Sequence, residues 1–125
     1  MMWHERMARR NPMPRKIIID TDPGVDDTMA IFFALQSPEL DVIGLTTIFG
    51  NVHTELATIN ALRLLEIAGR TDIPVAKGAD DPLAAPFKGP VPFVHGDDGQ
   101  GNLNLPPPKT RPVGQPAAVF IVEQI

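Results

Sequence analysis

The stretch KIIIDTDPGVDD, residues 16–27, contains the change of pattern that decides the fold. It opens with a β-branched run, which predicts a buried strand over Lys16–Asp20. Pro23 and Gly24 then end the strand. From Asp26 the pattern becomes helical up to Ser37, and its apolar side chains recur at Met29, Ala30, Phe33 and Ala34. The sequence therefore predicts a strand, a tight turn and a helix in direct succession.

The alternation of strands and helices continues along the chain. Asp41–Ile48 is predicted to be a second strand, and Pro74–Lys77 a third, shorter one. Between them we expect a helix that starts at Thr54 as N-cap and ends at Gly69. The side chains expected toward its core face are Leu56, Ile59, Leu62, Leu65 and either Ile67 or Ala68. This order indicates an α/β fold, a mostly parallel, Rossmann-like open sheet with flanking helices, which binds ligands at the carboxyl ends of its strands.

The two ends of the chain differ from this central pattern. Residues 1–15 are basic, and we expect a disordered extension there. Residues 79–116 are rich in Gly and Pro and predict a long loop. Gln115–Ile125 begins a further helix, with one apolar face formed by Ala118, Ile121, Val122 and Ile125. Because no cap follows this helix, we expect residues 16–125 to be the amino-terminal portion of a larger domain.

Composition and charge exclude several classes of protein. The 125 residues are enough for one domain at most, and the chain has no cysteine for a disulfide, a thiolate zinc site or a nucleophile. The net charge is -4, and the first 16 residues alone carry +4, so the rest of the chain is strongly acidic. An acidic surface disfavours nucleic-acid binding, which needs clustered Lys and Arg. No apolar run approaches the roughly 18 residues that a membrane span requires.

The basic start of the chain has two interpretations. A transit peptide is one, but the segment lacks serine; a disordered extension is the favoured one. No apolar core of a signal peptide is present, so we expect a cytosolic location.

Four aspartates occur within the eight residues DTDPGVDD, residues 20–27. Carboxylates this close raise one another's pKa, so their ionised forms need a cation or strong hydrogen bonds. Helix capping accounts for one or two of them but not for four. The pattern therefore favours a hard, oxygen-binding cation, Ca²⁺ or Mg²⁺.

Neither of two known acidic motifs matches DTDPGVDD in full. Counted from Asp20, an EF-hand loop needs Gly at position 6 and Glu at position 12, and neither is present. A phosphatase of the haloacid dehalogenase type also begins with a strand and Asp-x-Asp, so a Mg²⁺-dependent phosphohydrolase stays open as an alternative. The remainder of the motif, PGVDD, does not match that class.

Three motifs in sequence resemble the nucleoside hydrolase family, the inosine-uridine-preferring ribohydrolases. They are DTDPGVDD, then TTIFGN at residues 46–51, then VHGDDGQGN at residues 94–102. The resemblance extends over residues 16–125, with one departure at Gln100, where the family usually has Leu. It implies hydrolysis of the N-glycosidic bond of inosine, uridine or similar ribonucleosides by a calcium-activated water. It also implies a homo-oligomer for the full-length enzyme.

The resemblance also implies roles for individual residues. Asp22 matches the general base that touches Ca²⁺, Asp27 a metal ligand, and Asp26 the group that binds the ribose hydroxyls. Asn51 would contact the ribose or orient a carboxylate, unless it is only a turn residue. His95 would lie near the nucleobase as a candidate leaving-group acid, unless it only makes a hydrogen bond within its loop. Asp20 would orient the turn.

The remaining calcium ligands of the family come from later sequence. Two functional hypotheses follow from this. The chain is either part of an active hydrolase and inactive alone, or a short product that acts only as an interaction partner.

Overall fold

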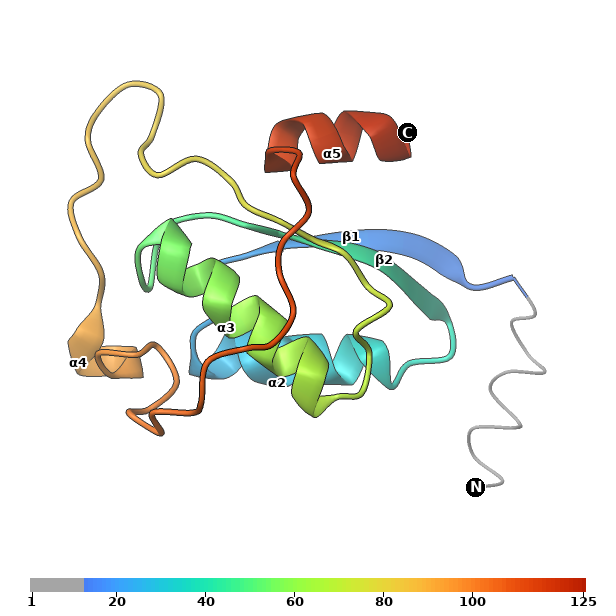
Figure 1. Ribbon diagram of the computed structural model, residues 1–125, viewed down its shortest axis with the longest axis horizontal. Coiled ribbons are helices and arrows are strands. Elements are labelled where there is room, and N and C mark those ends of the chain that lie inside the picture. The colour runs from blue at the N-terminus through green and yellow to red at the C-terminus, as the bar shows by residue number, and fades with distance from the viewer. Residues whose placement is uncertain (1–12) are drawn as a thin grey trace.

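The computed structural model describes residues 13–125 as a three-stranded sheet with helices on both faces (Figure 1). The strands are β1 (Arg15–Thr21), β2 (Leu40–Thr47) and β3 (Val75–Ala76), in the spatial order β1-β2-β3. Both pairs are parallel, which confirms the predicted α/β fold. Each strand begins and ends within one residue of its predicted bounds. Residues 1–12 of the predicted extension lie outside the described residues.

The helices are α2 (Val25–Leu35), α3 (Thr54–Ile67), α4 (Pro92–His95) and α5 (Ala117–Gln124). Figure 1 shows α2 and α3 on one face of the sheet and α5 on the other. The short α4 is the helical turn within the predicted long loop. Within residues 13–125, no helix has the length and hydropathy needed to cross a membrane.

The strands contribute to a core on each face of the sheet. Ile17 and Ile19 pack against the larger core under α2 and α3, and Ile18 packs against the smaller core under α5. A bulge makes Ile18 pair with Gly44 after Ile17 has paired with Val42, so β2 has one extra residue at this point. The larger core consists of Ile31, Ala34, Val42, Leu45, Ala61, Leu62, Leu64, Leu65, Ile73 and Val75.

The smaller core is built around Phe120 of α5. This ring is 4% exposed and packs with Ala76 and Ala117. It lies directly over β2: a Cβ added to Gly44 would be 2.6 Å from the ring. The absence of a side chain at Gly44 therefore lets α5 sit close to the middle strand.

Several predicted helix faces were wrong. In α2, Ala34 of the predicted pattern is buried, but Met29 and Phe33 are 72% and 76% exposed, and Ile31, outside the pattern, is buried. In α5 the buried residues are Ala117 and Phe120, whereas Val122 and Ile125 point to solvent. The reason is that both faces of these short helices carry apolar residues, so periodicity alone does not decide which face meets the sheet.

The prediction for α3 was partly right. Leu62 and Leu65 are buried as expected, but Leu56 and Ile59 are partly exposed, and Ala57, Ala61 and Leu64 complete the buried face. Thr54 is the first helical residue and not the N-cap: its hydroxyl donates to the Ala79 carbonyl at 2.6 Å. Gly69 follows the helix with φ +68°, which confirms the predicted glycine end.

A segment that we call the proline strap, residues 105–110, is bonded to α3. The Glu66 carboxylate accepts hydrogen bonds from the Lys109 and Thr110 amides and, at 2.7 Å, from the Thr110 hydroxyl. Arg63 Nε donates to the Pro106 carbonyl at 2.9 Å. These hydrogen bonds, that of the Thr110 hydroxyl first, hold the pKa of Glu66 below its ordinary value.

Candidate functional site

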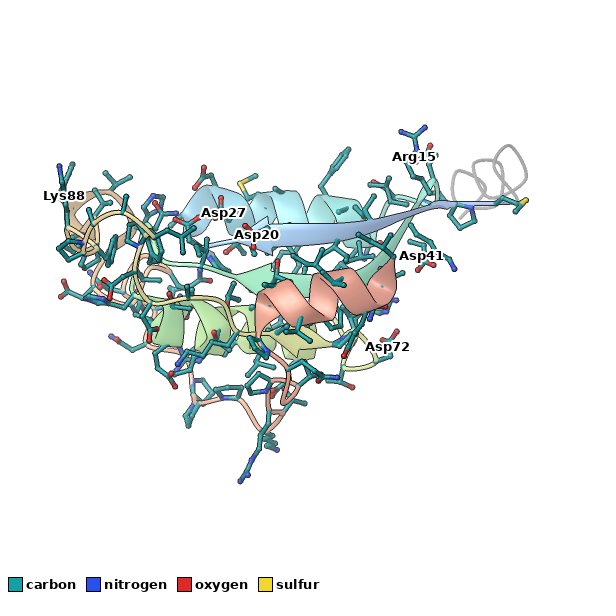
Figure 2. All side chains as sticks on the ribbon, turned by 90° about the horizontal axis from the view of Figure 1, so that it is seen from above. Arg15, Asp20, Asp27, Asp41, Asp72 and Lys88 are labelled. Carbon is teal, nitrogen blue, oxygen red and sulfur yellow. The ribbon has the colours of Figure 1, made fainter. Side chains whose placement is uncertain are left out.

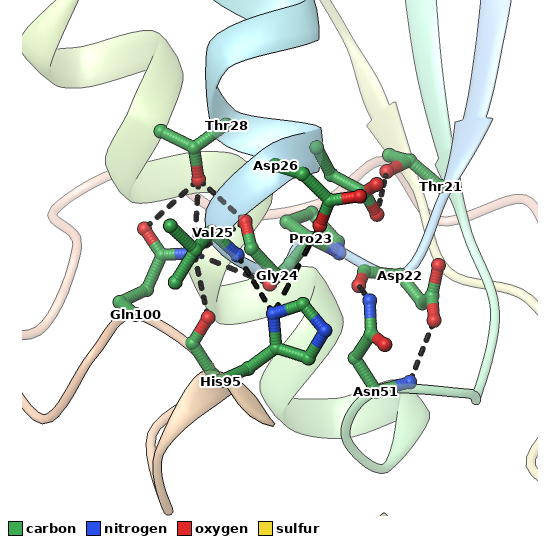
Figure 3. A network of polar contacts seen from close by, with 12 residues as sticks. Thr21, Asp22, Pro23, Gly24, Val25, Asp26, Thr28, Asn51, His95 and Gln100 are labelled. Carbon is green, nitrogen blue, oxygen red and sulfur yellow. Dashed lines mark hydrogen bonds and ion pairs between the residues drawn. The ribbon is translucent and has the colours of Figure 1, made fainter. Parts of the chain in front are cut away.

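Asp22 and Asn51 meet beyond the carboxyl ends of β1 and β2. The Asn51 amide donates to Asp22 Oδ2 at 2.6 Å, and Asn51 Nδ2 donates back to the Asp22 carbonyl at 3.1 Å (Figure 3). Gly50 leaves room for this pair, because a Cβ there would lie 2.1 Å from Asp22 Oδ2. The Asp22 carboxylate is thus fixed in one orientation by the turn after β2.

Asp27 lies in the first turn of α2, beside the same carboxylate group. The Thr21 hydroxyl donates to Asp27 Oδ2 at 3.1 Å. Burial raises the pKa of Asp27; the Thr21 hydroxyl lowers it, and the neighbouring Asp22 and Asp26 raise it further. The net effect on the pKa of Asp27 is upward, with burial as the largest cause.

Asp26 and His95 flank the start of α2. His95 Nδ1 accepts a hydrogen bond from the Val25 amide at 3.1 Å, and Asp26 Oδ1 is 3.9 Å from the same nitrogen (Figure 3). The Asp26 side chain is 80% exposed, whereas that of His95 is 12% exposed. A ring nitrogen that accepts a hydrogen bond carries no proton, so the neutral His95 has its proton on Nε2.

The loop of residues 94–102 is organised by Asp98. Its carboxylate accepts the amides of Gln100, Asn102 and Asn104 at 2.7 to 2.9 Å. Burial raises the pKa of Asp98, but these amides outweigh burial and the pKa is lowered. Asp98 was not predicted as a site residue; an Asp followed by Gly in a turn was the available signal.

Asp20 makes a different contact from the other aspartates. Its Oδ1 accepts the Thr46 hydroxyl at 2.6 Å, which joins β1 to β2. Figure 2 shows Asp20 near Asp27, whereas Asp41 and Asp72 lie toward the opposite end of the molecule. Asp20 therefore links β1 to β2 just before the turn that carries Asp22.

Asp22 and Asp27 fit a hard cation as part of a ligand set. Both present carboxylate oxygens, and a positive charge beside them would offset the burial and the repulsion by Asp22 and Asp26 that raise the pKa of Asp27. Within residues 13–125, no three acidic or histidine side chains converge closely enough to hold a metal ion by themselves. Further ligands, such as carbonyls, waters or other side chains, would have to complete the coordination.

A nucleoside hydrolase family model, described as inosine-uridine preferring nucleoside hydrolase, matches residues 17–125. The chain belongs to this family. The match covers every site residue described above. The alternative of a haloacid dehalogenase-type phosphohydrolase is not supported by it.

Individual nucleoside hydrolases show how similar the chain is. It is 64% identical over 111 residues to a probable uridine nucleosidase 2 from Arabidopsis thaliana, covering 88% of this chain and 34% of that protein. It is 41% identical over 114 residues to an inosine-uridine preferring nucleoside hydrolase from Leishmania major, covering 90% and 36%. The chain thus spans about a third of the length of these curated relatives.

Solved nucleoside hydrolase structures share the fold. A plant nucleoside hydrolase superposes with a TM-score of 0.85 at 54% identity, over 89% of this chain and 35% of that chain. A purine-preferring ribonucleoside hydrolase from Gardnerella vaginalis gives a TM-score of 0.83 at 36% identity, over 88% and 36%. The predicted family and the nucleoside hydrolase fold are therefore both confirmed.

Proposed function

We propose that the protein carrying this chain hydrolyses the N-glycosidic bond of ribonucleosides to ribose and free base. The observation that carries this proposal is the fixed Asp22 carboxylate, held by Asn51 beside Asp27, in a chain of this family. Uridine and inosine are the first substrates to test, because the relatives from Arabidopsis thaliana and Leishmania major are named for them.

Asp22 acts as the general base. A water oxygen attacks C1′ of the ribose, its proton passes to an oxygen of Asp22, and the C1′–N bond breaks. The hydrogen bond from the Asn51 backbone amide fixes the direction of the Asp22 carboxylate, so the carboxylate is oriented before substrate arrives.

Asp26 and His95 act on the two halves of the substrate. The exposed Asp26 carboxylate accepts hydrogen bonds from ribose hydroxyls. His95, with its proton on Nε2, donates that proton toward the departing base. The roles of Asn51 are to orient Asp22 and, through its remaining amide hydrogen and oxygen, to contact the ribose.

Asp22 and Asp27 would hold Ca²⁺. When bound, this ion supplies positive charge that makes water more acidic and attracts the ribose hydroxyls. Two carboxylates offer at most about four of the roughly six to eight oxygens that Ca²⁺ takes. We therefore propose that residues 1–125 by themselves are inactive.

The test is nucleoside hydrolysis by the longest form of the protein that carries this chain. Asp22→Asn keeps the shape and removes the base, so kcat should fall by at least about 10²-fold with little change in KM. Asp72→Asn is the matched control, since Asp72 pairs with Arg70 at the surface. Turnover of Asp22→Asn near the wild-type value would falsify the assignment.

Calcium is tested separately. Asp27→Ala should weaken calcium binding, measured by calorimetry, and lower activity in parallel. Unchanged calcium affinity in this variant would mean that Asp27 is not a ligand.

A further inference from the structure

The peptide group between Gly24 and Val25 is held at both ends by the loop of residues 94–102. Its carbonyl, Gly24 O, lies 3.3 Å from Gln100 Nε2. Its N–H, on Val25, donates to His95 Nδ1 at 3.1 Å. Figure 3 shows both contacts converging on the turn that separates β1 from α2. One loop therefore fixes the orientation of one peptide plane between Asp22 and Asp26.

Gln100 shares Gly24 O with Thr28, whose backbone amide and hydroxyl donate to the same oxygen at 3.1 and 2.8 Å. Gln100 is 8% exposed, and its Nε2 lies 3.1 to 3.3 Å from the Pro23 carbonyl, the Gly24 carbonyl and the Thr28 hydroxyl. The Thr28 hydroxyl has one proton, and its shortest acceptor is Gly24 O at 2.8 Å. The two hydrogens of Gln100 Nε2 are thus shared among the Thr28 hydroxyl and the carbonyls of Pro23, Gly24 and Gly99, the last at 3.2 Å.

We propose that Gln100 is a positioning residue whose side-chain amide, together with Thr28, fixes the Gly24–Val25 peptide group and thereby keeps His95 in its Nε2-protonated form. The location of the proton on the imidazole ring depends on this peptide group. As long as the Val25 N–H points at Nδ1, that nitrogen has to accept, and only Nε2 can carry the proton of a neutral imidazole. If the peptide plane turns, Nδ1 loses the donor that enforces this tautomer, because Asp26 at 3.9 Å is beyond hydrogen-bond distance.

The donor chemistry of Gln100 is the essential property. Leu at this position would fill the space but bind neither carbonyl. Without Gln100 both carbonyls keep another partner, Pro23 O from Asn60 Nδ2 at 3.4 Å and Gly24 O from Thr28. Gln100→Leu should therefore fold. Gln100→Glu keeps the shape of the side chain, but its carboxylate faces the carbonyl oxygens of Pro23 and Gly24 and repels them.

The experiment compares Gln100→Leu and Gln100→Glu with the wild type in the longest form that carries this chain. Ring ¹⁵N NMR at a pH of about 8.5, where ordinary histidine is neutral, reports the tautomer of His95. The His95 signals are assigned with His95→Gln. Gln36→Met, a glutamine change at an exposed position after α2, is the matched control.

The wild type and Gln36→Met should show His95 protonated on Nε2. Both Gln100 variants should show a mixture of tautomers, with exchange of the Val25 amide at least about tenfold faster. An unchanged His95 tautomer and Val25 exchange in both Gln100 variants would overturn the proposal. A wild type with the His95 proton on Nδ1 would overturn it as well.

The catalytic consequence rests on the proposed function. With nucleosides, Gln100→Leu should lower kcat about tenfold or more and leave KM nearly unchanged, because the leaving-group donor is misdirected. If the wild type hydrolyses no nucleoside while the tautomer result holds, the proposed function fails and the positioning role stands. If hydrolysis is normal in both Gln100 variants, the positioning role in catalysis fails and the proposed function stands.

Discussion

Gly50 controls the position of the base at the scale of a single residue. A methyl group at Gly50 would meet Asp22 Oδ2 at 2.1 Å, so the carboxylate must move away from the Asn51 amide. We expect Gly50→Ala to lower kcat at least about tenfold and to destabilise the fold by about 1–3 kcal/mol. Nucleoside hydrolysis and a thermal melt measure the two effects.

Gly114→Ala is the control for this substitution. A Cβ at Gly114 meets nothing within 4 Å, so both activity and melting temperature should stay at their wild-type values. Wild-type kcat in Gly50→Ala would show that Asp22 does not need its present position.

His95 is predicted to act on the leaving group. His95→Ala should lower turnover of uridine or inosine, whereas turnover of p-nitrophenyl riboside should change little, because p-nitrophenolate leaves without a proton. Parallel kinetics on the two kinds of substrate measure this difference. An equal loss on both would assign His95 to the ribose or the loop.

The sequence predicted the charged residues of the site better than the residues that hold them. Asp22, Asp27 and Asn51 stand next to strand ends in recognisable motifs, and the structure brings all three together. Gly50 and Thr28 were missed, because their importance depends on distances between segments. Gln100 was noticed only as a departure from a family pattern.

Glu66 anchors the proline strap to α3 at the scale of an element. Glu66→Gln should lower the melting temperature at pH 7, because an amide presents its own donors to the amides of Lys109 and Thr110. Thermal melts measure the difference, and limited proteolysis reports cleavage within residues 105–110. Glu123→Gln, at an exposed position in α5, should leave both unchanged.

The effect of Glu66 depends on pH in a definite direction. A carboxyl whose pKa is lowered by folding stabilises the protein above its unfolded pKa, which is about 4.3 for Glu, and loses this contribution as the pH falls through the folded pKa. The melting temperatures of wild type and Glu66→Gln should therefore differ at pH 7 and approach each other below about pH 4. A constant difference across this range would exclude the Glu66 carboxylate as the cause.

Elements were predicted in order and type because each strand is a short β-branched run with turn residues beside it. Their faces were less predictable. In α2 the apolar pattern includes Met29 and Phe33 as well as Ala34, and only packing against the sheet decides that Ala34 and Ile31 are the buried residues. Threonine is a common N-cap residue, but the Thr54 hydroxyl donates its hydrogen bond to the carbonyl of Ala79, 25 residues further along the chain.

Phe120 holds α5 against the sheet at the scale of the whole molecule. Phe120→Ala removes a ring that is 4% exposed, so the free energy of unfolding should fall by about 3 kcal/mol or more. Val122→Ala, at a site 71% exposed in the same helix, should change it by less than about 0.5 kcal/mol. Urea unfolding compares them, and equal effects would show that α5 does not depend on this contact.

The layered arrangement followed from the strand and helix order, since βαβ units place helices over a parallel sheet. The sequence pattern did not predict contacts between segments far apart in the chain. Examples are the contact of the proline strap with α3 and that of Gln100 with the turn after β1. Such contacts join residues more than 40 positions apart and have no local periodicity.

The contact between Gly44 and Phe120 has an evolutionary consequence. A side chain at position 44 collides with the ring while phenylalanine is present, and a smaller residue at position 120 leaves a void while glycine is present. Each single change destabilises the protein. When both occur, the new side chain at position 44 fills part of the space left by the Phe120 ring, so the two effects should partly compensate. Lineages that replace one of these residues are therefore expected to have replaced the other, and the order of the two steps decides which intermediate they passed through.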